Sequence, residues 1–150
     1  MIITFIGHSR LILEKEMLDK IRSTIRAETV SEGNVSFYLG GCGSFDEHCA
    51  SLCREIKKDL PSCEVVFVTP YITESAQERM KSLIDMKLYD GTIYPPIEKT
   101  PLRFAISKRN EWMISEADLV IAYVSHSFGG AYKSLKYAEQ KKKRIINLAK

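Results

Sequence analysis

The sequence lacks any apolar run close to the roughly 20 residues needed to cross a bilayer. The apolar N-terminal segment Met1–Ile6 has neither a basic stretch nor a cleavage site, so we expect it to form a strand and not a signal peptide. Charge of one sign is also scarce, because 22 basic residues are spread among 19 acidic ones for a net charge of +3. These absences predict a cytoplasmic protein with no membrane partner, and the small net charge disfavours nucleic acid as a partner.

Cysteine is sparse, and its four residues form no C-x-x-C pair. A domain of 150 residues does not need disulfides, so reduced thiols are expected. Cys49 and Cys53 fall on one apolar helical stripe and are predicted to be small core residues. Neither Cys42 nor His48 completes a zinc-ligand pattern with them. The sequence therefore predicts no metal and no bound cofactor.

Apolar runs alternate with helical patterns along the whole chain. Continuous apolar runs are typical of strands covered on both faces, and strand–helix alternation indicates a parallel sheet. The expected strands are 2–6, 35–39, 65–68, 119–124 and 145–148, with a short one near 92–94, and the expected helices are 11–27, 45–60, 73–86, 105–116 and 131–142. Residues 1–150 are thus predicted to form one α/β domain, a Rossmann-like three-layer αβα sandwich with a mostly parallel sheet.

Two glycine-containing loops each follow a strand and open a helix. Such loops offer bare backbone N–H groups to a phosphate at a positive helix end. If their strands are neighbours, both loops face one cleft at the point where the strand order reverses. Ser44 could instead only cap its helix, and Asp46 could serve the helix dipole or accept from a ribose hydroxyl. The candidate ligand residues in these loops are Gly40, Gly41, Gly43, Ser44, Asp46, Ser125, His126, Ser127, Gly129 and Gly130.

Further candidates lie after the first strand and on the helix 105–116. Gly7, His8 and Arg10 belong to the same expected sheet edge, although His8 could be a simple polar loop residue. Arg109 and Asn110 are predicted near the strand ends, with Arg109 at the rim of the cleft, where a guanidinium can bind a phosphate. The alternative for Arg109 is a solvated helix charge.

The runs that carry a resemblance are 89–96, 103–113, 117–121, 129–131 and 145–148. Together they make the chain similar to the YpsA-like family of bacteria and their phages over essentially its whole length. That family belongs to the SLOG superfamily of Rossmann-like proteins, alongside DprA and the "lonely guy" phosphoribohydrolases. The resemblance implies a nucleotide or nucleotide-derived ligand, such as an ADP-ribose-like molecule, and a homo-oligomer. Trp112, Phe104 and Tyr132 offer apolar surface for such self-association.

The enzymes of that superfamily carry an R-K-x-x-M helix and a later P-G-G-x-G-T-x-x-E motif. Here Arg109 and Met113 are kept, Asn110 replaces the Lys, and Leu135 stands where the catalytic Glu belongs. Cleavage of an N-glycosidic bond needs a carboxylate, so the sequence favours a binding protein over a hydrolase. Asp46, Glu47 or Glu111 could supply a relocated acid, and a DprA-like role on DNA is a third possibility. Among these, we expect a sensor, carrier or sequestering protein for a nucleotide-derived molecule.

Overall fold

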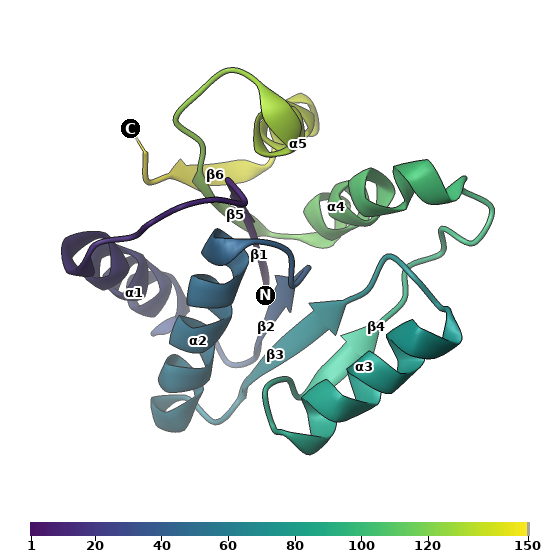
Figure 1. Cartoon of the computed structure of the whole chain (residues 1–150). Coiled ribbons are helices and arrows are strands. Elements are labelled where there is room, and N and C mark those ends of the chain that lie inside the picture. Colours follow the sequence, from purple (N-terminus) through teal and green to yellow (C-terminus); the bar gives the residue numbers. More distant parts are fainter. Residues whose placement is uncertain (150) are drawn as a thin grey trace.

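The computed structural model describes residues 1–149 and contains six strands that form one all-parallel sheet (Figure 1). The expected α/β, Rossmann-like fold is confirmed. The elements follow the chain as β1 (Ile2–Gly7), α1 (Lys15–Thr29), β2 (Val35–Leu39), α2 (Ser44–Asp59), β3 (Cys63–Val68), α3 (Glu74–Asp85), β4 (Gly91–Ile93), a 3-10 turn (Leu102–Phe104), α4 (Ala105–Glu116), β5 (Leu119–Tyr123), α5 (Gly129–Gln140) and β6 (Arg144–Asn147).

The start of α1 differs from the expected one by four residues. The sequence pattern predicts a helix from Leu11, but the helix begins at Lys15. The backbone N–H of Leu11 donates to Ser44 Oγ at 2.7 Å, which ties this segment to α2 before the helix begins. Leu11 and Leu13 still pack against the core, so their apolar character reflects burial of a loop.

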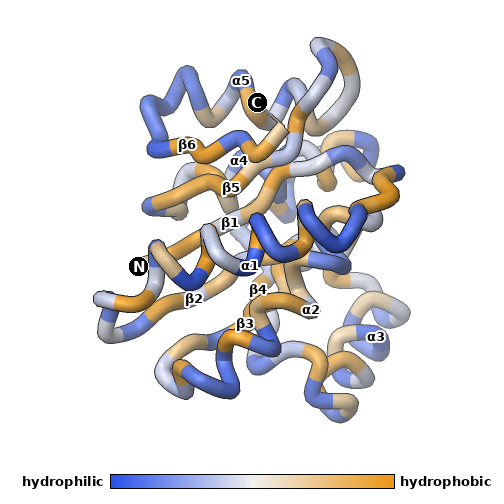
Figure 2. Tube along the Cα trace, turned by 90° about the vertical axis from the view of Figure 1, so that its left-hand side faces the viewer, coloured by the Kyte–Doolittle hydropathy of each residue, from blue (hydrophilic) through white to orange (hydrophobic). Residues whose placement is uncertain are grey.

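Alternate residues of the strands point to opposite faces and build two cores. Ile3, Phe5 and Ile121 pack with residues of α1 and α2 on one face. Ile6, Val120 and Ala122 pack with residues of α4 and α5 on the other. In Figure 2 the apolar colours follow the strands, whereas the helices are largely hydrophilic along their outer sides. The result is the three-layer arrangement that the sequence predicts.

The order of the strands is β4-β3-β2-β1-β5-β6. The chain therefore adds strands on one side of β1 as far as β4, then crosses to the other side to form β5 and β6. The order reverses between β1 and β5, which makes the carboxyl ends of these two strands the switch point of the sheet. Gly7 pairs with Tyr123 in the register, so the two following loops leave the sheet at the same level.

Candidate functional site at the carboxyl edge of the sheet

Three aromatic rings stack at the switch point. His8, from the loop after β1, lies on His126, from the loop after β5, with ring centroids 3.7 Å apart and planes 14° apart. His126 stacks in turn on Phe128 at 3.9 Å. Phe128 is 69% exposed, although an apolar ring of this size is more often buried. The stack of His8, His126 and Phe128 therefore offers a flat aromatic surface to solvent.

Hydrogen bonds fix the two histidines in place. The backbone N–H of Ser125 donates to His8 Nε2 at 3.0 Å, so this nitrogen is an acceptor. Burial lowers the pKa of His8 below its ordinary value, and the neighbouring His126 lowers it further. Both effects favour the neutral imidazole that the Ser125 contact requires. His126 Nδ1 lies 3.0 Å from the carbonyl oxygen of Phe128.

The N-terminus of α5 lies beside this stack. The helix begins at Gly129, whose φ of +87° suits a residue without a side chain. It has no side-chain cap and no acidic residue in its first turn. The positive end of the helix is thus left without an anionic side chain at the point where the aromatic surface begins.

The N-terminus of α2, which the sequence also predicts as a phosphate site, differs from that of α5 because it carries acidic side chains. Asp46 and Glu47 stand in its first turn. The N–H of Ser44 donates to the carbonyl of Ser9 at 2.9 Å, and the N–H of Cys42 donates to Asp46 Oδ2 at 3.4 Å. Because the chain's own oxygens occupy this helix end, it is less suited to an external anion than that of α5.

Packing accounts for Gly7, Gly40 and Gly43. A Cβ on Gly40 would lie 2.7 Å from Cζ of Arg109, and one on Gly43 would lie 2.6 Å from Cα of Ser9. A Cβ on Gly7 would lie 2.2 Å from the Phe45 ring. These glycines let the loops after β1 and β2 approach each other and the Arg109 side chain. Their position therefore needs no ligand to explain it.

Arg109 does not lie at the rim of a cleft, contrary to the sequence-based expectation. Its side chain is 1% exposed, and Nη1 donates to the carbonyls of Gly40 and Val68, both at 2.9 Å. Nε donates to Asn110 Oδ1 at 2.9 Å. The guanidinium thus joins the carboxyl ends of β2 and β3 to α4. Ile106, on the same helix, points outward and is 43% exposed, although its apolar side chain would be expected to face the sheet.

The two glycine loops do not come from neighbouring strands, because β1 lies between β2 and β5. The loop after β1 instead contacts both of them. Ser9 binds Ser44 on one side, and His8 binds Ser125 on the other. Arg10, in the same loop, is exposed, and so is Ser127. All the predicted loop residues thus share one edge, with the β1 loop as the bridge between them.

A small polar cavity of about 50 Å³ lies next to the end of β1. Asp46, Asn110 and Ser134 reach it from α2, α4 and α5. Burial raises the pKa of the Asp46 carboxyl to about 6, although the Arg109 guanidinium acts to lower it. The cavity has room for one or two water molecules or one substituent of a ligand, but not for a whole nucleotide.

A larger hollow of about 310 Å³ lies beyond the glycine loop, at the ends of β2 and β3 and beside α3. Cys42 lines both this hollow and the small cavity. The only charged residue that lines the hollow beside α3 is Arg79, whose guanidinium lies 5.3 Å from the centre of the Phe67 ring. Sequence reasoning missed this hollow. The signal that could have indicated it is the Thr73 cap of α3, which closes the short loop containing Pro70 after β3.

Other expected features can be placed briefly. Cys49 and Cys53 are buried in the core between α2 and the sheet, as predicted, and burial raises the pKa of both thiols. Within residues 1–149 no group of three or more potential metal ligands comes together. No helix in this part of the chain is both long and apolar enough to cross a membrane.

Comparisons with known proteins give similarity at the level of fold. No protein-family profile and no curated protein sequence matches the chain. Among solved structures, DNA processing protein A (DprA) from Helicobacter pylori matches 96% of this chain and 63% of its own, with 16% identity and a TM-score of 0.61. DprA from Streptococcus pneumoniae matches 95% of this chain and 48% of its own, with 14% identity and a TM-score of 0.62. The protein TM1055 matches 96% of this chain and 71% of its own, with 14% identity and a TM-score of 0.58.

The H. pylori structure is described as showing a single-stranded DNA binding mode of that protein. The present chain spans less than two thirds of the length of either DprA. At such identities the similarity is one of fold. The chain therefore shares the DprA-type Rossmann-like fold, with its own set of residues at the carboxyl edge.

Proposed function

We propose that this protein binds a nucleotide-derived small molecule at the carboxyl edge of its sheet, as a sensor, carrier or sequestering protein. The observation that carries the proposal is the exposed stack of His8, His126 and Phe128 at the switch point. Open α/β sheets bind ligands at this place, and a nucleobase is a flat ring that stacks on aromatic side chains. A base lying on Phe128 would extend the stack by one ring.

The phosphate of such a ligand has a matching partner close by. The uncapped N-terminus of α5 begins directly after Phe128, and no carboxylate in its first turn opposes an anion. We assign the backbone N–H groups from Gly129 onward, with the Ser127 hydroxyl, to this contact. His8 and residues Ser125, His126, Ser127, Gly129 and Gly130 of the sequence-based prediction thus remain in the proposed site, whereas Arg109 has a structural role.

The hollow beside α3 offers room for the remainder of a larger ligand. Its single cation, Arg79, suits a second phosphate or a sugar phosphate. An ADP-ribose-like molecule carries a base, a pyrophosphate and a second ribose, so it matches both the aromatic stack and the second hollow. This ligand class also agrees with the YpsA-like resemblance, including a role in trapping a signal molecule if the chain is encoded by a phage.

Mass spectrometry of small molecules released by heat from natively purified protein tests this proposal directly. We expect a phosphate-containing compound with a nucleobase, present at a substantial fraction of the protein concentration. Protein with Phe128→Ala, purified in parallel, should carry clearly less of it. Release of no such compound, together with no binding of ADP-ribose, AMP or cyclic nucleotides, would contradict the proposal.

A second candidate function rests on Asp46. A carboxyl with a pKa of about 6, in a polar cavity beside the proposed site, has the properties of a general acid or base. Leu135, by contrast, is 5% exposed and packs into the core of the α5 face. Hydrolysis would therefore need a relocated acid. Chromatography should show whether free base accumulates from AMP or ADP-ribose, and whether Asp46→Asn abolishes it.

Single-stranded DNA is a further ligand to include in the same assays, because one structure of similar fold is described as binding it. The aromatic stack would suit a terminal base of a strand as well as a free nucleotide. The small net charge of +3 still favours the small ligand. A short oligothymidine that binds more tightly than AMP or ADP-ribose, with loss of binding in Phe128→Ala, would favour the DNA function.

A further inference from the structure

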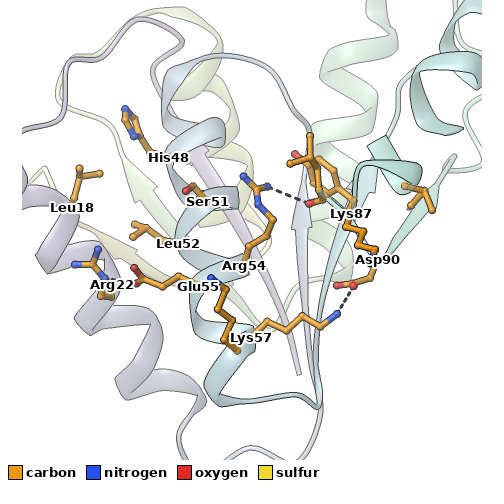
Figure 3. A pocket seen from close by; sticks show the side chains of 14 residues that line it. Leu18, Arg22, His48, Ser51, Leu52, Arg54, Glu55, Lys57, Lys87 and Asp90 are labelled. Atoms are coloured by element: carbon orange, nitrogen blue, oxygen red, sulfur yellow. Dashed lines mark hydrogen bonds and ion pairs between the residues drawn. The ribbon is translucent and has the colours of Figure 1, made fainter. Parts of the chain in front are cut away.

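A large hollow lies away from the carboxyl edge, on the outer side of α2. It is a groove of about 880 Å³ between α1 and α3, with α2 as its floor (Figure 3). Aliphatic side chains from all three sides line it, namely Leu18, Leu52, Ile84 and Leu88. The groove is therefore open, and its lining combines these aliphatic side chains, of which Leu52 is only 6% exposed, with polar and charged ones.

The rim of the groove is strongly basic. Its lining includes Arg22, Arg54, Lys57, Lys58 and Lys87. Only two carboxylates, Glu55 and Asp90, oppose these cations within the groove. The lining residues thus carry an excess of three positive charges, and Asp19, just outside the lining, pairs with Arg22 at 2.6 Å. Positive charge is therefore in excess along this groove.

The chain's own contacts neutralise only part of this rim. Arg22 pairs with Glu55 at 2.5 Å, and Lys57 pairs with Asp90. Arg54 donates only to the carbonyl of Leu88, at 3.2 Å. In the described part of the chain, Lys58 and Lys87 have no carboxylate partner. Three cations thus remain available to an external acidic group.

Helix α3 leaves one side of the groove without a tight protein partner. It is amphipathic in sequence, yet none of its residues is buried. Ile84, on the groove side, is 36% exposed. An amphipathic helix normally buries its apolar face, so α3 has apolar surface that the described chain does not use.

We propose that this groove docks an acidic, amphipathic helical segment of a partner protein. Aliphatic residues of the segment would lie on Leu18, Leu52, Ile84 and Leu88, while its carboxylates pair with Arg54, Lys58 and Lys87. Helix-in-groove binding uses this combination of an apolar floor and a charged rim. The proposal is independent of the ligand at the carboxyl edge.

The same features favour a peptide over a nucleic-acid strand. Single-stranded nucleic acid needs aromatic faces on which its bases stack. The only aromatic side chain other than His48 in the groove is Tyr89, and its ring is already packed against Phe67, with centroids 5.4 Å apart. If a nucleic-acid strand lay in the groove, the aliphatic side chains of its floor would contact polar bases and sugars. A helix with leucines on one side and glutamates on the other matches both parts of the groove.

Fluorescence anisotropy with the full chain tests the proposal. The probe is a labelled amphipathic peptide of about 20 residues with leucines at helical spacing and glutamates on its flanks. A matched peptide has glutamine in place of each glutamate. We expect saturable binding of the acidic peptide, at least about tenfold tighter than that of the matched peptide, and weaker binding at higher salt.

Charge-reversal variants test whether the acidic peptide binds in the groove. The double variant Lys58→Glu/Lys87→Glu should weaken binding of the acidic peptide at least about tenfold. The control Lys99→Glu/Lys142→Glu changes the net charge equally at exposed positions outside the groove and should bind as wild type does. Ile84→Asp should also weaken binding, and circular dichroism checks that each variant keeps its fold.

Several results would overturn the proposal. These are absence of saturation up to about 1 mM peptide, equal binding of the two peptides, and equal loss in the groove and control variants. Preferential binding of oligothymidine at the groove, lost in Lys58→Glu/Lys87→Glu, would assign the surface to nucleic acid instead.

Discussion

Arg109 shows how one residue can have a different role from the one its sequence context suggests. An arginine on a helix near the strand ends fits a phosphate site, and a sequence cannot reveal that its guanidinium turns inward. In the fold, two strand-end carbonyls and the absence of a side chain at Gly40 create a buried place for that group. The residue type was identified correctly, but the direction of its side chain depends on tertiary contacts.

Replacement of Arg109 by methionine should therefore reduce stability and not only ligand binding. The variant leaves the carbonyls of Gly40 and Val68 without their buried donor, which should lower the free energy of unfolding by about 2–4 kcal/mol. Urea denaturation followed by circular dichroism measures this. The exposed Arg103→Met provides the control and should change stability by less than about 0.5 kcal/mol. A stable Arg109→Met protein that has lost only ligand binding would restore the phosphate role.

Asp46 makes the stability of the protein depend on pH. Its pKa rises from an ordinary 3.8 to about 6 in the folded protein, so ionisation is harder in the folded than in the unfolded chain. The folded state thus loses stability as the pH rises from about 4 to about 6. Asp46→Asn lacks this loss and should be more stable than wild type by about 3 kcal/mol at pH 8, with little difference at pH 4.

Thermal or urea unfolding at both pH values would measure the Asp46 effect. Asp85→Asn, on the exposed end of α3, is a matched control and should show no such trend. If Asp46→Asn were instead less stable than wild type at pH 8, the ionised carboxylate would be a stabilising cap of α2.

At the scale of elements, the sequence predicts the existence of almost every strand and helix, because buried parallel strands are continuous apolar runs. It fails where apolar residues are partly buried without being helical, as at Leu11 and Leu13. It also fails at α4, where Ile106 points outward and Arg109 inward. The apolar period of this helix is weak, so its orientation depends on contacts with strands distant in the chain.

Exposed apolar side chains gather at the 3-10 turn and the start of α4. Phe104 and Ile106 are 45% and 43% exposed, and Leu102 beside them is 73% exposed. Trp112, another residue expected to contribute, is instead stacked on Tyr38 with centroids 5.8 Å apart. We propose that Leu102, Phe104 and Ile106 form a contact between copies of the chain, since contiguous exposed apolar residues mark interaction sites.

Light scattering after size-exclusion chromatography tests this contact. Wild type should form a dimer or larger homo-oligomer, and Phe104→Asp/Ile106→Asp should be monomeric at the same concentration. Val30→Asp, an equally polar change at a residue 74% exposed at the end of α1, should leave the oligomer intact. A wild-type monomer across a wide concentration range would refute self-association.

At the scale of the whole molecule, the strand order decides which loops can share a ligand. The sequence indicates two glycine loops at one sheet edge, but not that β1 separates their strands. The switch point consequently pairs the β5 loop with the β1 loop, and it brings His8 to His126 across 118 positions of the chain. Both histidines are candidates from sequence, whereas Phe128 as the exposed end of their stack becomes evident only in three dimensions.

Isothermal titration calorimetry of ADP-ribose against wild type, Phe128→Ala and Val30→Ala tests the central claim most directly. Loss of one aromatic stacking partner costs about 1–3 kcal/mol, so Phe128→Ala should weaken binding by about five- to a hundredfold. Val30→Ala removes an exposed apolar side chain at the opposite edge of the sheet and should bind as wild type does. Equal affinity of all three proteins, or no binding by wild type to ADP-ribose or to AMP in the same titration, would contradict a nucleotide site at the switch point.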